Sequence, residues 1–166
     1  MTFLISHRGN LSGPNPTAEN SPEYLREALE AGFQVEVDVW LHRDKFYLGH
    51  DEPKYQVTPK FLLFDFTNPY STGLYRTSPF WCHAKNLEAV HELSIYGQSV
   101  HWFWHQTDDV ALTSKNVLWT YPGKRILRKM HLPTIAVMPE LAPEWDISEA
   151  DGICSDYIVN YDRRNA

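Results

Sequence analysis

The stretch Val35–Val39 reads VEVDV and places two carboxylates, Glu36 and Asp38, two positions apart. Side chains alternate between the two faces of a β-strand, so the valines share one face and the carboxylates the other. In a half-buried strand the carboxylates would be solvated, and for an isolated E-x-D motif this is the more common arrangement. If they point inward instead, a divalent cation is the simplest partner that neutralises them.

A second apolar run carries groups that suit such a site. Trp81, His83 and Lys85 alternate with small apolar residues, so an imidazole and an ammonium group are predicted to approach the carboxylates. His83 taken alone fits a metal ligand and a hydrogen-bonded core histidine equally well. The sequence therefore predicts carboxylates, an imidazole and an ammonium group on the inner face of neighbouring strands.

About seven short apolar runs are predicted as strands, and most of them end in polar residues. The runs are FLIS, VEVDV, FWC, VHWFW, NVLWTY, TIAVM and GIC. Polar groups at the carboxyl ends of strands are typical of parallel sheets that bind ligands at that edge. Residues at these ends are His105, Gln106, Trp119, Tyr121, Glu140 and Asp156. Aromatic faces beside carboxylates suit a polyol or a sugar, although core packing explains each aromatic residue singly as well.

Two helices are predicted between these strands, over residues 21–32 and 86–97. Ser21 and Asn86 are the expected N-caps of the two helices. Strand, helix and strand follow one another twice, which forms two β-α-β units. The side chains expected on the buried face of the second helix are Leu87, Val90 and Ile95.

The chain has 166 residues, of which 43% are hydrophobic, and this is enough for a single globular domain over residues 1–166. The predicted fold class is α/β, a trimmed TIM-type (β/α) barrel with about seven to eight mostly parallel strands. A complete barrel needs about 250 residues, so fewer outer helices than usual are expected. Residues 123–133 allow about two helical turns, residues 142–151 about one, and residues 52–78 are predicted as an irregular excursion.

The formal charge of -6 and the lack of any Lys/Arg-rich run argue against nucleic acid or an anionic membrane as the main partner. The N-terminal stretch MTFLISHRG has no basic region and only a short apolar run, so neither a signal peptide nor membrane insertion is expected. Cys82 and Cys154 each lie in an apolar run, which fits buried thiols in a reducing compartment. A cytoplasmic location is therefore predicted.

Several polar motifs occur in a defined order: HRG at 7–9, EN at 19–20, ExDV at 36–39, a short hairpin, and HD at 50–51. A lysine at the end of the third predicted strand and DGICSDY near the C-terminus follow. Together they resemble the glycerophosphodiester phosphodiesterase family, part of the phosphatidylinositol phospholipase C-like superfamily. The resemblance is strong over residues 3–51 and looser over 81–86 and 151–157.

The resemblance implies roles for individual residues. His7 and His50 match the two catalytic histidines of the family, which act as general acid and base. Arg8 matches the arginine that clamps the phosphate, and Glu36 and Asp38 match two ligands of a Mg²⁺ or Ca²⁺ ion. Lys85 matches a phosphate-binding position, and the positions that support the site correspond to Glu19, Asn20 and Asp51. His105 and Trp119, at the ends of later strands, are expected to contact the substrate.

The sequence departs from the family pattern in three ways. His83 stands where the family usually has a metal-binding carboxylate, and a nitrogen ligand adds Mn²⁺ and Zn²⁺ to the candidate metals. The hairpin that contains His42 and Lys45 lacks the usual glycine and is one residue short. Much of the insert that helps to cover glycerol in the family is missing, which leaves the choice of substrate open.

These motifs predict an enzyme, a metal-dependent phosphodiesterase that hydrolyses a glycerophosphodiester or a related polyol or sugar phosphodiester. The resemblance implies histidine acid-base catalysis through a cyclic phosphate, with a small-molecule or glycan phosphodiester as partner. The alternative is a non-catalytic module that binds a metal and a phosphoglycan. His83 in place of a carboxylate favours the module, whereas the presence of both His7 and His50 favours the enzyme.

Overall fold

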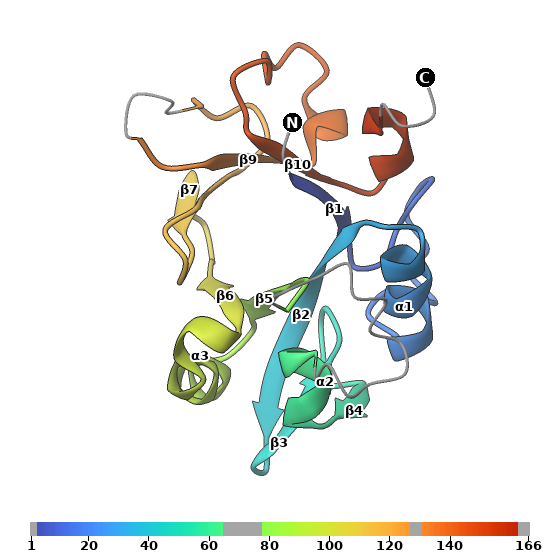
Figure 1. Cartoon of the computed structure of the whole chain (residues 1–166), viewed down its shortest axis with the longest axis vertical. Coiled ribbons are helices and arrows are strands. Elements are labelled where there is room, and N and C mark those ends of the chain that lie inside the picture. Colours follow the sequence, from blue (N-terminus) through green and yellow to red (C-terminus); the bar gives the residue numbers. More distant parts are fainter. Residues whose placement is uncertain (1–2, 65–77, 127–130, 163–166) are drawn as a thin grey trace.

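The computed structural model describes residues 3–64, 78–126 and 131–162 of the chain, and it is built around one curled sheet of ten strands (Figure 1). The strands are β1 Phe3–His7, β2 Gln34–His42, β3 Lys45–Leu48, β4 Tyr55–Val57, β5 Phe80–Ala84, β6 His101–Trp104, β7 Val110–Leu112, β8 Leu118–Thr120, β9 Thr134–Val137 and β10 Gly152–Ser155. The α-helices of the described residues are α1 Pro22–Glu30, α2 Pro59–Leu63 and α3 Leu87–Ile95. Short 3₁₀ turns span Gly97–Ser99, Pro139–Leu141 and Ile158–Tyr161.

The sheet is mixed and open. The series β6-β5-β2-β1-β10-β9-β8 is parallel throughout, whereas β3, β4 and β7 are antiparallel to their partners. Among the described residues no strand pairing joins β6 to β7 or β8, so the sheet curls into a half-barrel without closing. The predicted TIM-type (β/α) barrel is therefore wrong.

The later connections are long enough for a crossover but form no α-helix in their described residues, so no outer ring of helices forms. A parallel crossover covered by a helix needs a dozen or more residues, most of them helical. Between β9 and β10 the chain forms only the 3₁₀ turn Pro139–Leu141, and no helix forms over residues 142–151, where one turn was predicted. The two turns predicted over residues 123–133 fall partly on 127–130, outside the described residues.

Helix α1 forms where the sequence predicts it. The Ser21 side chain accepts a hydrogen bond from the Tyr24 backbone N–H at 3.3 Å, and Pro22 occupies the first helical position. Leu25, Ala28 and Leu29 are buried and pack against β2. Capping and the apolar stripe therefore agree on one orientation for this helix.

Helix α3 also begins as predicted, and Val90 packs against the core as expected, but the rest of its buried face is different. Leu87 and Ile95 are 69% and 64% exposed, whereas Ala89 and Leu93 are fully buried. The cap explains the rotation, because the Asn86 amide accepts from the Leu41 N–H at 3.1 Å and donates to the Leu41 carbonyl at 2.8 Å. These bonds to β2 fix the start of the helix and leave Leu87 on the outer side.

Two apolar layers lie on the two faces of the sheet. Val35, Val37 and Val39 are fully buried on the convex face, in one core with side chains of all three helices. The concave face has its own core, which includes Ile5, Trp81, Phe103, Trp119 and Ile135. The carboxylates of β2 share this concave face, because they alternate with the valines.

Two further predictions concern local structure. Residues 52–64 contain β4 and α2, so the irregular excursion predicted over residues 52–78 is wrong there, and residues 65–77 lie outside the described residues.

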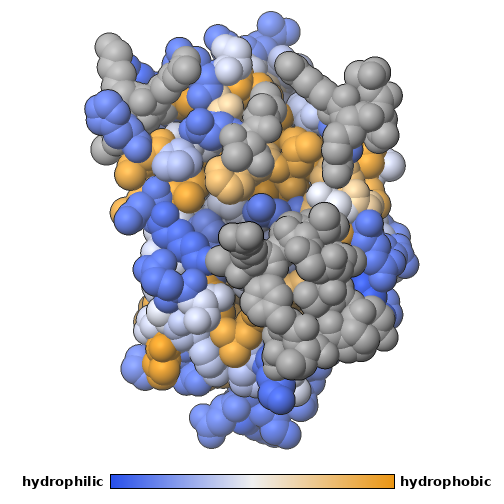
Figure 2. Space-filling view, in the orientation of Figure 1, coloured by the Kyte–Doolittle hydropathy of each residue, from blue (hydrophilic) through white to orange (hydrophobic). Residues whose placement is uncertain are grey.

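The β2–β3 hairpin turns without glycine because Arg43 and Asp44 take φ values of 49° and 58°. Hydrophilic side chains cover the lower end of the molecule, where this hairpin projects (Figure 2).

Cys82 and Cys154 are buried and free, as predicted, and burial raises the pKa of both thiols. Within the described ranges, no helix combines the length and the apolar character needed to cross a membrane.

Candidate functional site

A cavity of about 1000 Å³ opens at the carboxyl ends of the parallel strands. Every residue predicted for the site lines this cavity except Asp38, which is buried beneath it. The predicted lining residues are His7, Arg8, Glu19, Asn20, Glu36, His50, Asp51, His83, Lys85, His105 and Trp119. Parallel pairing of β1, β2 and β5 brings together groups that are up to about 80 positions apart in the sequence.

Glu36, Asp38 and His83 form a carboxylate–histidine cluster. One potential ligand atom from each residue lies within 4.8 Å of the other two. His83 Nδ1 lies 3.1 Å from Asp38 Oδ1 and 3.8 Å from Glu36 Oε1, while its Nε2 faces the His105 carbonyl at 3.5 Å. A histidine whose second nitrogen faces a carbonyl is a common arrangement for a metal ligand, because the carbonyl fixes the tautomer.

Glu36 supplies the test of whether a cation fits this cluster. Its Oε2 atom is buried and has no hydrogen-bond partner. Burial, followed by the negative charge of Asp38, raises the pKa of the Glu36 carboxyl. A divalent cation would satisfy this oxygen and relieve the repulsion, so the three residues fit a metal site.

Asp38 is the most heavily paired residue of the site. Its Oδ2 lies 2.9 Å from Arg8 Nε and accepts a 3.0 Å hydrogen bond from Asn20 Nδ2, while Oδ1 lies 3.3 Å from Lys85 Nζ. The Asn20 side-chain oxygen Oδ1 accepts a hydrogen bond from the Asp38 backbone N–H at 2.9 Å. Burial alone would raise the Asp38 pKa, but the His83 hydrogen bond and the two cations outweigh it and hold the pKa well below its usual range.

The HRG motif turns the chain directly after β1. Arg8 adopts φ 54° and its side chain reaches Asp38 on one side and Glu19 Oε2, at 3.3 Å, on the other. Gly9 follows with φ 93°, and a Cβ atom there would lie 2.7 Å from the Tyr24 ring. Arg8 is therefore fixed by two carboxylates, and its Nη2 carries two further hydrogens that a phosphate oxygen can accept.

His7 is oriented by a carboxylate from the far end of the chain. Its Nδ1 lies 2.8 Å from Asp156 Oδ1, and its Nε2 lies 3.8 Å from Glu36 Oε2. Asn10 Nδ2 also donates to Asp156 Oδ1 at 2.8 Å, and Glu140 accepts from the Asp156 N–H at 2.8 Å. Burial opposes protonation of His7, but the bond to Asp156 and the charge of Glu36 outweigh it, so the His7 pKa is raised.

Asp156 is the site residue whose role the sequence does not predict, although it follows a predicted strand. Asp156 comes directly after β10, and β10 pairs with β1, which ends in His7. Only the pairing of the first and last strands brings the two side chains together. The alternation of side chains along β10 and the polar residue that follows it could have indicated that Asp156 faces the site. Neither feature indicates which strand lies next to β10.

Asp156→Asn is expected to lower the His7 pKa, because the acceptor charge is lost. The pKa of His7 is raised in the folded protein. Its contribution to stability is therefore complete below pH 6.5, the ordinary pKa of histidine, and is lost as the pH rises through the folded-state pKa. The pKa of Asp156 is lowered in the folded protein. Its contribution to stability is therefore complete above pH 3.8, the ordinary pKa of aspartate, and is lost as the pH falls through the folded-state pKa. The stability difference from wild type is therefore largest between pH 3.8 and 6.5.

The measurement is an NMR titration of the His7 ring protons with parallel urea denaturation at several pH values. Asp44→Asn, in the exposed turn of the β2–β3 hairpin, is the matched control. An unchanged His7 titration in Asp156→Asn would contradict the assigned pairing.

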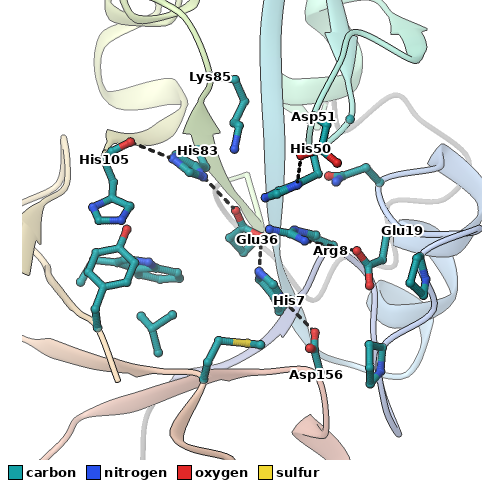
Figure 3. A pocket seen from close by; sticks show the side chains of 18 of the residues that line it. His7, Arg8, Glu19, Glu36, His50, Asp51, His83, Lys85, His105 and Asp156 are labelled. Atoms are coloured by element: carbon teal, nitrogen blue, oxygen red, sulfur yellow. Dashed lines mark hydrogen bonds and ion pairs between the residues drawn. The ribbon is translucent and has the colours of Figure 1, made fainter. Parts of the chain in front are cut away.

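His50 approaches the same centre from the β3 side. Gly49 has φ 148° and the Glu52 carbonyl lies 2.2 Å from where its Cβ would be, so only glycine fits this turn. His50 Nδ1 lies 2.7 Å from Asp51 Oδ1, on a side chain that is 90% exposed. In Figure 3 the His7 and His50 rings point toward Arg8 from opposite sides.

His105 and Trp119 lie on a different wall from the ion pairs, with His105 opposite Glu19 in Figure 3. The His105 ring stacks on Tyr121 with centroids 3.7 Å apart. Trp119 is the middle residue of β8 and is only 2% exposed, with its ring 4.7 Å from Phe103. Both residues line the cavity, but neither takes part in the ion pairs of Arg8 and Lys85 described above.

The charges of the site restrict what it can bind. The permanent cations of the described lining are Arg8, Lys54 and Lys85. They are outnumbered by carboxylates, which are Glu19, Glu36, Asp51, Glu52 and Asp156 in the lining and Asp38 beneath it. An anionic ligand would be repelled unless a further cation were present.

No protein-family model, curated protein or solved structure matches the chain. What the site can do therefore follows from its own side chains.

Proposed function

We propose that this protein is a metal-dependent phosphodiesterase acting on a glycerophosphodiester or a related polyol or sugar phosphodiester. One observation carries the proposal: two histidines, His7 and His50, line one cavity on either side of Arg8 and beside the carboxylate–histidine cluster. An acid-base pair, an anion clamp and a metal site are the groups that cleavage of a phosphodiester requires.

The carboxylate–histidine cluster would hold a divalent cation. Glu36 and Asp38 supply oxygen ligands suited to Mg²⁺ or Ca²⁺, and the nitrogen of His83 also suits Mn²⁺ or Zn²⁺. The cation would neutralise phosphate oxygens and the charge that grows in the transition state. This accounts for an acidic site that receives an anionic substrate.

Arg8 and Lys85 bind the phosphate from the side of Asp38. Both are held by that buried carboxylate, at 2.9 Å and 3.3 Å, so their positions are set before the substrate arrives. Each retains N–H groups for a non-bridging phosphate oxygen. Preorganised donors of this kind stabilise developing charge more effectively than water does.

His7 is suited to be the general acid. Asp156 holds its Nδ1 and raises its pKa, which favours the imidazolium form, whose Nε2–H can be donated to the leaving alkoxide. His50 is then the base that removes the proton of the attacking hydroxyl. A neighbouring hydroxyl of the substrate is the proposed nucleophile, and water opens the cyclic phosphate that results.

Chelation is expected to abolish phosphomonoester release from a panel of glycerophosphodiesters and sugar phosphodiesters. Glu36→Gln should weaken divalent metal binding by at least about 10–100-fold, the usual loss when a partner outside the ligand shell is changed, because here a charged ligand itself is lost. The measurements are product release with and without EDTA, and calorimetric titration of the apoprotein with Mg²⁺ and Mn²⁺. Glu88→Gln, on the exposed side of α3, is the matched control. Hydrolysis that survives chelation unchanged would contradict the metal dependence.

A non-catalytic metal- and phosphoglycan-binding module is the second candidate. Two observations favour it: His83 lies in the ligand cluster, and the carboxylate that pairs with His50 among the described residues is 90% exposed. Metal binding without product from any member of the panel would select this candidate. In either case the buried free thiols Cys82 and Cys154 fit a reducing compartment such as the cytoplasm.

A further inference from the structure

Asn10 comes directly after the HRG motif, and neither the sequence motifs nor the mechanism proposed above gives it a role. Its side chain is fully buried, although asparagine is mostly exposed in proteins. A buried side-chain amide needs partners for its two donor hydrogens and its acceptor oxygen. The partners of Asn10 are groups that hold two different parts of the site.

The side-chain amide of Asn10 joins two carboxylates. Its Nδ2 atom donates to Asp156 Oδ1 at 2.8 Å and to Glu19 Oε1 at 2.9 Å. Its Oδ1 atom accepts from the Asn15 backbone N–H at 3.0 Å. Hydrogen bonds to charged acceptors are stronger than those between neutral groups. A flipped amide would place Oδ1 against both carboxylates, so these partners also fix the orientation of the amide.

Each of the two carboxylates holds one group of the proposed reaction. The Asp156 oxygen that accepts from Asn10 is the one that lies 2.8 Å from His7 Nδ1. The other oxygen of Glu19, Oε2, lies 3.3 Å from Arg8 Nη1. The His7–Asp156 and Arg8–Glu19 pairs lie next to one another in Figure 3. One continuous chain of hydrogen bonds through Asn10 therefore holds both the histidine and the arginine.

The backbone of Asp156 is fixed independently of Asn10. Its N–H donates to Glu140 Oε1 at 2.8 Å, and its carbonyl oxygen accepts from the Gly13 N–H at 2.8 Å. The remaining freedom is rotation of the carboxylate about the side-chain bonds, and the bond from Asn10 restricts this rotation. Glu19 has a longer side chain with more rotamers, so a fixed partner for its Oε1 atom restricts it further.

We propose that Asn10 is a positioning residue that orders the general acid His7 and the phosphate clamp Arg8 together, so that both are placed or both are lost. The kinetic consequence rests on the proposed phosphodiesterase function, whereas the geometry does not. Without the Asn10 donors, Asp156 and Glu19 would repel each other and rotate apart. The acid would then lose its orientation, and the clamp would lose one of its two anchors.

The test uses Asn10→Asp, which keeps the acceptor for the Asn15 N–H and removes both donors. Asn116→Asp, in an exposed turn, is the matched control. The hydrogen-bonded Nδ1 proton of His7 is followed by NMR without metal or substrate, and binding of inorganic phosphate is followed by calorimetry with Mg²⁺ present. Asn10→Asp is expected to remove the slowly exchanging His7 proton and to weaken phosphate binding by about 10–100-fold, the usual effect of losing an outer partner that orients a site.

Two one-sided variants separate this role from a general loss of structure. Asp156→Asn is expected to remove the slowly exchanging His7 proton and to keep the phosphate affinity of the wild type. Glu19→Gln should do the reverse, because its carbonyl still accepts from Asn10 while its amide no longer pairs with Arg8. With the ester panel, Asp156→Asn should lower kcat and Glu19→Gln should raise KM, whereas Asn10→Asp should do both.

A folded Asn10→Asp variant that keeps either the His7 proton or the wild-type phosphate affinity would overturn the proposal. If this variant does not fold, the wild type decides. Both Asn10 Nδ2 protons are expected to exchange with solvent at least about tenfold more slowly than those of Asn116, and equally fast exchange would overturn the proposal. No hydrolysis of any ester would overturn the phosphodiesterase alone, because the proton and phosphate measurements need no turnover.

Discussion

If the proposed phosphodiesterase function holds, replacing His7 by Gln is expected to lower kcat for phosphodiester hydrolysis by about 10²–10⁴-fold, the usual contribution of a positioned general acid. His7 is placed for this role because Asp156 holds Nδ1 at 2.8 Å and leaves Nε2 facing the cavity. Gln can still donate a hydrogen bond to Asp156, so the fold is retained, but it carries no proton that can be transferred. The measurements are initial rates at saturating metal and thermal unfolding by circular dichroism.

His91→Gln, on the exposed side of α3, makes the same change away from the cavity and is expected to keep wild-type rates. A substrate with a good leaving group, which needs little protonation, should lose much less activity in His7→Gln than the natural esters do. If both substrates lose the same factor, His7 acts as something other than the acid. If neither loses activity, the acid-base mechanism is wrong.

Asp38→Asn is expected to lower the free energy of unfolding by about 3 kcal/mol, the lower end of the range for a broken buried ion pair. Asp38 is fully buried and is the counter-charge for both Arg8 and Lys85. The lower end applies because Arg8 keeps its contact with Glu19, and both cations are partly exposed. Urea denaturation at neutral pH measures the loss, and Asp44→Asn in the exposed hairpin turn is the control.

The sign of the pH dependence provides a second check on Asp38. Its folded-state pKa is lowered, so its stabilising effect is full above the ordinary value of 3.8 and is lost as pH falls through the folded value. The difference between wild type and Asp38→Asn should therefore be constant at neutral pH and shrink only in strong acid. A difference that grows as pH falls would mean that Asp38 is not the counter-charge of the two cations.

Local patterns in the sequence predicted much of this structure. The alternation in VEVDV predicted that Glu36 and Asp38 would share one face, and the ordered motifs HRG, GHD and HAK around it selected the inner face. The N-caps Ser21 and Asn86 predicted where α1 and α3 begin. These features depend on neighbouring residues and strand parity, which the sequence contains directly.

Features that depend on distant contacts were predicted wrongly or not at all. Whether the sheet closes depends on how β6 meets β7, and neither run signals its partner. The rotation of α3 is set by Asn86 bonding to Leu41, which lies 45 positions away. The pairing of Asp156 with His7 spans 149 positions and follows from the contact of β1 with β10. Tertiary contacts of this kind override local periodicity.

The contact of β1 with β10 also sets the order in which the site is completed as the chain is synthesised. Arg8, Glu36 and His83 come from the first half of the chain, whereas Asp156 follows its last strand. A nascent chain that has not reached β10 can therefore assemble the cation-binding carboxylates but has no partner for His7 Nδ1. Contacts of such sequence separation form late and slowly in folding. The proton transfer that we propose for His7 would therefore depend on the docking of the final strand.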